Sequence, residues 1–192
     1  SDVAQGYLTS EIPLYNSDYI KHDYIVQSKG AFFESIEGFY NLAKYKLTSE
    51  VRVVLTKKNY DNLEDLIYFI YKNIPFVDHI ALMGLEYIGF TLNNLDDIHI
   101  SPLEYKDKLV DAIGVAKKYN LPISIYNLPL CLVDEKVQKY AKQSISDWKN
   151  EFSDVCDECA VRDSCSGMFT STKPYFEPLL IPIKSTACVT SL

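Results

Sequence analysis

The sequence predicts an α/β fold: a partial (β/α) barrel of about four parallel βα units, followed by a small cysteine-rich extension. Two observations predict it. Four segments repeat the order of apolar strand, polar turn and amphipathic helix, which is typical of parallel strands joined by right-handed crossovers. Beyond the last unit, three of the five cysteines lie within residues 156–165. We therefore assign residues 8–150 to the barrel portion and 151–192 to the extension and tail.

The first two units have clear strand and helix patterns. An apolar strand is expected over residues 11–15, and a helix over 32–46 with apolar side chains at helical spacing. The second strand, 51–55, is rich in β-branched residues. Its helix is expected over 62–73, with leucine and isoleucine on one face. We also expect five aromatic residues of the first helix region to belong to the core: Phe32, Phe33, Phe39, Tyr40 and Tyr45.

The third and fourth units follow the same order. A strand over 78–83 leads to a helix over 101–119, whose start is marked by a Ser–Pro–Leu–Glu capping box. The fourth strand is expected over 123–126, and Asp134 is expected to cap a helix reaching residue 149. The proline-rich tail predicts an extended arm with one short strand over 179–183. Four such units are half of an eight-stranded barrel, but they also fit a small open sheet.

Composition limits the classes of function. The chain has 192 residues with 26 acidic and 19 basic side chains, a net charge of −7, which argues against a nucleic-acid-binding face. No apolar run approaches the roughly 18–20 residues that span a membrane. Without a signal peptide the protein is expected in the cytoplasm, with reduced thiols. Because the chain starts with Ser rather than Met, we expect a processed or excised fragment.

Polar residues recur where the predicted strands end, which is where parallel α/β folds place their sites. The simplest alternative is that asparagine and aspartate form turns after strands. Glu86 differs, because it follows an apolar run and should be partly buried. The histidines His22, His79 and His99 show no ligand spacing, and we expect loop or packing roles for them. The strand-end residues are Tyr15, Asn16, Thr56, Asn59, Gly84, Glu86, Tyr126 and Asn127.

The cysteine run C-x2-C-x5-C, formed by Cys156, Cys159 and Cys165, predicts a metal site. A C-x2-C pair lets two thiolates bind one metal or cluster. Iron–sulfur and zinc sites usually need four ligands, so we expect the fourth from Cys131, with Cys188 as the alternative. Spacing alone does not separate a [4Fe–4S] cluster from zinc.

The chain also contains a set of short phrases: PLYN (13–16), HD (22–23), GAF (30–32), RVVLT (52–56), ALMGLE (81–86), YNLPLC (126–131) and SISDWKN (144–150). Taken together, they resemble radical S-adenosylmethionine (SAM) enzymes, most closely the maturases associated with His-Xaa-Ser repeat peptides. The resemblance covers about residues 8–172. The cysteine run resembles the SPASM or twitch extensions of such enzymes, which bind auxiliary iron–sulfur clusters.

The resemblance implies a ribosomally made peptide as substrate, and both SAM and a second [4Fe–4S] cluster in the full-length parent. It implies that Thr56 and Asn59 lie near SAM. The residues implied near the substrate are Tyr15, Asn16, Glu86 and Asn127. In such enzymes, a reduced cluster cleaves SAM to methionine and a 5′-deoxyadenosyl radical, which takes a hydrogen atom from the substrate.

One departure from the family is decisive for this chain. Radical SAM enzymes carry C-x3-C-x2-C after the first strand, but this sequence has no cysteine before Cys131 and no G-G-E motif. We therefore expect a C-terminal portion that is inactive alone and that dimerises through exposed barrel edges. The alternative is a non-catalytic zinc-binding module that recognises a peptide or protein.

Overall fold

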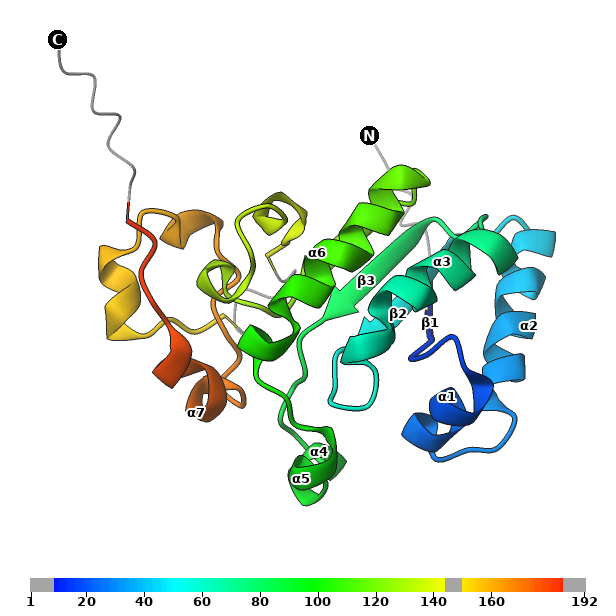
Figure 1. Ribbon diagram of the computed structural model, residues 1–192, viewed down its shortest axis with the longest axis horizontal. Helices are drawn as coiled ribbons and strands as arrows, with labels where there is room; N and C mark the ends of the chain where they lie inside the picture. The colour runs from blue at the N-terminus through cyan, green and yellow to red at the C-terminus, as the bar shows by residue number, and fades with distance from the viewer. Residues whose placement is uncertain (1–8, 144–149, 185–192) are drawn as a thin grey trace, which may run out of the picture.

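The computed structural model describes residues 9–143 and 150–184 and contains a four-stranded parallel sheet (Figure 1). Neighbouring strands in the sheet are also consecutive in the sequence. Since right-handed crossovers between such strands put every helix on the same face, the long helices cover one face of the sheet, and no described helix covers the other, which we call the open face. The strands are β1 (Ser10–Pro13), β2 (Ser49–Val54), β3 (His79–Met83) and β4 (Ile123–Tyr126).

Three long helices cover the sheet: α2 (Ala31–Lys44), α3 (Leu63–Asn73) and α6 (Pro102–Lys118). In Figure 1, α3 and α6 lie side by side in front of the strands, and α2 lies at the end of the sheet near β1. The core forms between these helices and alternate strand residues such as Val51, Val53, Ile80 and Leu82, all fully buried. The predicted α/β fold with four parallel strands is confirmed, and it is compatible with part of a βα barrel.

The predicted start of α6 is confirmed in detail. The Ser101 hydroxyl accepts a hydrogen bond from the Leu103 N–H at 3.4 Å, and the Glu104 carboxylate accepts one from the Ser101 N–H at 3.2 Å. Pro102 occupies the first helical position. These contacts satisfy donors that the first turn of a helix would otherwise leave unpaired.

The open face of the sheet carries polar side chains. On β2, the residues that alternate with the buried valines are Glu50, Arg52 and Val54, and each is only partly buried. Glu50 lies opposite His79 on β3, and Arg52 lies opposite Ala81. The strands are therefore less uniformly apolar than a sheet covered on both faces.

Three short helices were not expected: α1 (Tyr19–Val26), α4 (Phe90–Asn93) and α5 (Leu95–Ile98). The side chain of Asp18 caps α1 by accepting from the Ile20 N–H at 2.8 Å. The buried residue of α1 is His22, so this helix has no apolar stripe that a periodicity analysis detects. In the described part of the chain, no helix is long and apolar enough to cross a membrane.

The helix expected over 134–149 is wrong for the residues described. The chain forms the 3-10 turns η2 (Leu130–Leu132) and η3 (Gln138–Tyr140), and then runs beside β4. The Lys142 N–H donates to the Ile125 carbonyl at 2.8 Å, so the backbone pairs with the sheet edge instead of with itself. Residues 144–149 lie outside the described residues.

The strand expected over 179–183 is also wrong. The chain forms α7 (Lys173–Phe176) and the 3-10 turn η7 (Glu177–Leu179), and residues 180–183 have no regular structure. Two prolines in this segment, Pro178 and Pro182, lack the N–H groups that a strand ladder needs.

The aromatic residues expected in the core divide between two faces of α2. Phe32 and Phe39 are buried, as predicted. Phe33, Tyr40 and Tyr45 are exposed, with more than half of each side chain in solvent. The prediction fails for Phe33 and Tyr40 because residues adjacent to an inward position on a helix point about 100° away from it, and for Tyr45 because it lies after the last residue of α2.

Candidate metal centre

Four cysteines from separate segments line one pocket. Cys131 lies in η2, directly after the end of β4. Cys156 lies in the 3-10 turn η5 (Asp154–Glu158), and Cys159 ends that turn. Cys165 follows η6 (Arg162–Ser164). The structure thus places Cys131 in the same pocket as the C-x2-C-x5-C run. That these cysteines bind a metal stays a prediction, and Cys188 lies outside the described residues.

Backbone N–H groups point at the sulfur atoms. The Cys165 Sγ accepts hydrogen bonds from the Leu130 N–H at 3.3 Å and the Gly167 N–H at 3.4 Å. The Leu130 contact ties the chain beside Cys131 to the cysteine run, although 35 residues separate the two partners. Such N–H···S bonds favour the thiolate form, which is the form that binds a metal.

Gly167 adopts a conformation that shapes this pocket. Its φ is 62°, in the left-handed region, and a Cβ at this position would lie 2.5 Å from the Glu151 carbonyl oxygen. Glu151 and Met168 exchange two backbone hydrogen bonds at 2.7 and 2.9 Å, which fix the chain at this point. Only glycine fits here, because both the backbone angle and the close approach exclude a side chain.

The rest of the pocket lining is mainly apolar and includes Phe152, Val155 and Leu180. The cavity measures about 20 Å³, which leaves room for about one water molecule. Burial raises the pKa of the Cys131 and Cys165 thiols, and the nearby Cys156 sulfur adds to both shifts. Backbone hydrogen bonds oppose these shifts without cancelling them, so both thiols are protonated at neutral pH when no metal is bound.

Four thiols are the right chemical donors for zinc or an iron–sulfur cluster. Their sulfur atoms, however, are not placed around one common position where an ion could sit. Among residues 9–143 and 150–184, no group of three or more His, Cys, Asp or Glu side chains is arranged to hold an ion. A zinc ion needs sulfur atoms about 2.3 Å away, and an iron–sulfur cluster occupies far more space than the cavity provides. Binding either would require the walls to separate and the thiols to lose protons.

The polar residues after β2 form a closed turn. The Asn59 amide oxygen accepts from the Thr56 N–H at 2.8 Å and the Thr56 hydroxyl at 3.1 Å. The Asn59 NH₂ group donates to the Val54 carbonyl at 2.9 Å. Both side chains are buried, with Asn59 fully so. Their polar atoms therefore hold the loop after β2 in shape.

The loop after β1 and the helix α1 each contain a buried donor that lacks a partner. The Asn16 side-chain oxygen accepts from the Asp18 N–H at 2.9 Å, but its Nδ2 is buried without a hydrogen bond. His22 Nδ1 accepts from the Tyr15 N–H at 3.1 Å, while its Nε2 is also buried and unpaired. Burial lowers the pKa of His22, which keeps the ring neutral, and raises the pKa of Tyr15.

Glu86 and Asn127 follow β3 and β4, so they belong to the same carboxyl-terminal edge of the sheet. Both are partly buried. Asn127 has a left-handed φ of 62° and lies beside Ser166 and Gly167 in a small pocket next to the cysteines. The structure thus connects Asn127 to the cysteine pocket through neighbours that the sequence pattern did not indicate.

Sequence reasoning missed a polar chain on the open face of the sheet. His79 Nδ1 lies 2.8 Å from Glu50 Oε2, and His79 Nε2 lies 3.0 Å from Ser124 Oγ. The sequence does show alternating polar residues and valines in β2. Because alternate residues of a strand point to opposite faces, this alternation could have predicted one polar face of the sheet. Packing roles fit the other two histidines, because His22 is buried and His99 hydrogen bonds to the Tyr87 hydroxyl at 2.7 Å.

Comparison of the chain with protein families and with curated protein sequences finds no match.

Proposed function

We propose that the chain is the C-terminal part of a radical SAM enzyme that modifies a ribosomally made peptide, with an auxiliary [4Fe–4S] cluster in its cysteine pocket. The observation that carries this proposal is that Cys131, Cys156, Cys159 and Cys165 line one apolar pocket beside the end of β4. The all-parallel sheet with helices on one face also supports a partial barrel. The family resemblance supplies the reaction and the substrate class.

In this proposal, the four cysteine thiolates hold the cluster, which when bound supplies electron-transfer chemistry beside the barrel. The apolar lining keeps water from the sulfur atoms, and the N–H groups of Leu130 and Gly167 stabilise the negative charge on Cys165. Apolar residues 180–182 form a wall without regular structure. This wall is the part of the pocket best able to shift when the cluster enters.

The residues at the carboxyl edge of the sheet have proposed roles toward SAM and substrate. Thr56 and Asn59 fix the loop beside SAM, because their own polar atoms are already paired with each other. Glu86 and Asn127 are partly buried, so their polar atoms are available toward a peptide substrate. Tyr15 and Asn16 belong to the same edge. The proposal includes a cytoplasmic location and, for this chain alone, dimerisation through exposed barrel edges.

The first experiment tests the cluster. The purified chain is reconstituted without oxygen using iron and sulfide, and its iron, sulfide and absorption spectrum are measured. We expect about four iron and four sulfide per chain, with broad absorption at about 400 nm. Replacing Cys131 or Cys165 with Ala should abolish or strongly reduce cluster content, whereas Cys188→Ala should retain it. A chain that takes up no iron and sulfide would refute the auxiliary cluster.

The second experiment tests the activity of the chain alone. The reconstituted chain is mixed with SAM and a strong reductant, and 5′-deoxyadenosine is measured. Because no cysteine precedes Cys131, we expect no reductive SAM cleavage. Formation of 5′-deoxyadenosine would contradict the proposal that the chain lacks the catalytic cluster.

A zinc-binding module for peptide or protein recognition is the second candidate. The observation that favours it is the small cavity of about 20 Å³, since one ion requires less opening of the pocket than a cluster does. A colourless protein with about one tightly bound zinc per chain would support this function. It would refute the auxiliary cluster if iron and sulfide did not displace the zinc.

A further inference from the structure

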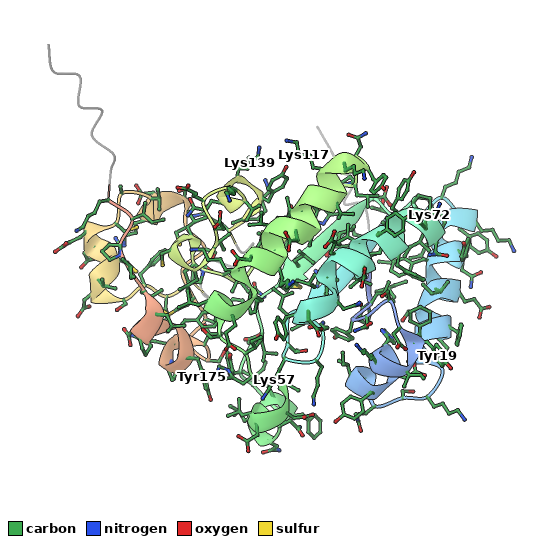
Figure 2. All side chains as sticks on the ribbon, viewed as in Figure 1. Tyr19, Lys57, Lys72, Lys117, Lys139 and Tyr175 are labelled. Atoms are coloured by element: carbon green, nitrogen blue, oxygen red, sulfur yellow. The ribbon has the colours of Figure 1, made fainter. Side chains whose placement is uncertain are left out.

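A second site lies at the opposite edge of the sheet from the cysteines. Glu50, His79 and Ser124 lie near the beginnings of β2, β3 and β4, whereas Cys131 follows the end of β4. Lys139 lines this site with His79 and Ser124. Figure 2 shows Lys139 at the edge of the molecule, close in this view to Lys117 near the end of α6.

The three side chains are joined in the order found in serine hydrolases. The His79 Nδ1 lies 2.8 Å from Glu50 Oε2, and the His79 Nε2 lies 3.0 Å from Ser124 Oγ. A carboxylate only accepts hydrogen bonds, so Nδ1 carries the proton in a neutral ring and Nε2 accepts from the Ser124 hydroxyl. This tautomer leaves His79 able to take the hydroxyl proton.

Further contacts orient Glu50. The Arg52 Nε donates to Glu50 Oε1 at 2.9 Å, and Arg52 also pairs with Glu11 on β1. The Glu50 side chain is 14% exposed, and that of His79 is 24% exposed. One carboxylate oxygen therefore holds the arginine while the other holds the imidazole.

A pocket gives access to Ser124 and His79. It is a shallow hollow, open to solvent, with a volume of about 430 Å³. Its lining includes apolar residues 121–123 and two lysines, Lys139 and Lys142. No acidic side chain lines it among the described residues. An acyl compound with a negative charge is the ligand class that this lining favours.

We propose that Ser124, His79 and Glu50 form a site that hydrolyses small anionic acyl esters. The Ser124 Oγ bonds to the acyl carbon while its proton passes to His79 Nε2. As the ester C–O bond breaks, the leaving alcohol takes that proton and the acyl group stays on Ser124. Water, deprotonated by His79, then releases the acid, so the net reaction consumes one water and needs no oxidant or reductant.

The groups around His79 define the other roles. Glu50 is a positioning residue, because it reaches the substrate only through His79. Tyr126 packs edge-on to the imidazole, with ring centroids 6.2 Å apart, and it lies two residues after Ser124 on β4, so both side chains are on the same face of the sheet. We assign the Tyr126 hydroxyl to the oxyanion that forms on the acyl carbon. Among the described residues, the other charged side chains at this site are Arg52, which bonds to Glu50, and Lys139 and Lys142, which line the pocket with His79.

The test uses the full 192-residue chain with p-nitrophenyl acetate, p-nitrophenyl hemisuccinate and a fluorophosphonate probe. We expect a burst of p-nitrophenol, and an acyl or phosphonyl group on the peptide that contains Ser124. We expect kcat/KM to be about tenfold higher for the anionic hemisuccinate than for the acetate. A wild-type chain with neither burst nor labelled Ser124 would overturn the proposal, whatever the metal content of the cysteine pocket.

Variants separate the roles. Ser124→Ala should abolish labelling, and His79→Gln should lower kcat/KM by about 100-fold or more. Glu50→Gln should lower kcat/KM by up to about 10⁴-fold through kcat with KM unchanged, because the imidazolium that forms during the reaction loses its carboxylate partner. Tyr126→Phe should lower kcat by about tenfold or more with labelling retained.

The matched control is Ser49→Ala. Ser49 is a strand serine that is 2% exposed, comparable with Ser124 at 5%, but it lies on the helix-covered face of β2. Its replacement should leave both labelling and hydrolysis unchanged. Equal loss in Ser49→Ala and Ser124→Ala, with circular dichroism unchanged, would overturn the assignment of Ser124 as the nucleophile.

Discussion

The carbonyl oxygen of Asn127 occupies the space that a side chain on Gly84 would need. A Cβ at Gly84 would lie 2.6 Å from this oxygen and 2.8 Å from Leu128 Cδ2. Gly84 follows β3 and Asn127 follows β4, and the Gly84 N–H donates to the Tyr126 carbonyl at 2.9 Å. The loop after β4 therefore packs its backbone directly against Gly84 in the loop after β3. This contact lies at the edge of the sheet where we propose that substrate binds.

We expect Gly84→Ala to destabilise the protein by about 1–3 kcal/mol, because the backbone of Asn127 must move to accept the methyl group. Urea unfolding followed by circular dichroism measures this change. The control is Gly114→Ala in α6, where no atom lies within 4 Å of the added Cβ. There the change should stabilise by up to about 1 kcal/mol through helix propensity. Equal stability of the two variants would contradict the packing that the structure describes.

Much of the fold followed from the sequence because burial and periodicity coincide in it. The strands at β2 and β4 and the helix α6 have β-branched runs, a capping box or a clear apolar face. The short helix α1 was not predicted, because its buried residue is His22 and a search for apolar residues at helical spacing does not count a histidine. The helix expected after Asp134 fails because the free edge of β4 competes for the same backbone groups.

The candidate sites show the same limit. The position of Cys131 after the fourth strand indicated it as the fourth ligand, and in the structure it lines the same pocket as the cysteine run; that the four cysteines bind a metal stays a prediction. The contact of His79 with Glu50 and Ser124 was not predictable, since it depends on the registers of three strands. The unpaired donors on Asn16 and His22 were not predictable either, because the sequence does not show that tertiary packing buries them.

The thiols of the metal-free protein should differ from exposed thiols in reactivity. Burial raises the pKa of Cys131 and Cys165 above the ordinary value of 9.0, and the thiolate is the form that is alkylated. We expect slow labelling of both by iodoacetamide at pH 8, rising as the pH passes above 9, and fast labelling after unfolding in urea. Mass spectrometry of the peptides measures each site. Fast labelling of folded, metal-free Cys165 at pH 8 would show that the sulfur is not buried.

Stability should depend on pH through Asp23. Its carboxylate accepts from the Gly30 N–H at 2.6 Å and the Phe32 N–H at 2.9 Å, and these bonds lower its pKa below the ordinary 3.8. A carboxyl with a lowered folded-state pKa stabilises fully above its unfolded value and loses that contribution as the pH falls through the folded one. We expect Asp23→Asn to be less stable than wild type at pH 6, with the difference shrinking below about pH 3.8.

Thermal unfolding of both proteins from pH 2.5 to pH 7 measures the Asp23 effect. Asp111→Asn on the exposed surface of α6 controls for the loss of one negative charge. A stability difference between wild type and Asp23→Asn that is the same at every pH would exclude the carboxylate contacts as its cause.

The last prediction concerns Gly167 and links the fold to the metal centre. Its left-handed φ of 62° and the 2.5 Å approach of the Glu151 oxygen exclude a Cβ, while its N–H donates to Cys165. We therefore expect Gly167→Ala to displace this donor and to lose most of the iron, sulfide or zinc that the wild type binds. Gly30→Ala is the matched control, because Gly30 also has a positive φ, 90°, but no atom lies within 4 Å of the added Cβ. That variant should pay a backbone strain of about 1 kcal/mol and still bind metal like the wild type, since α2 begins far from the cysteines (Figure 1). The metal content of both variants is measured after reconstitution. Loss in Gly167→Ala alone would mean that metal binding depends on the geometry around Cys165. Equal loss in both variants would mean that it depends on overall stability.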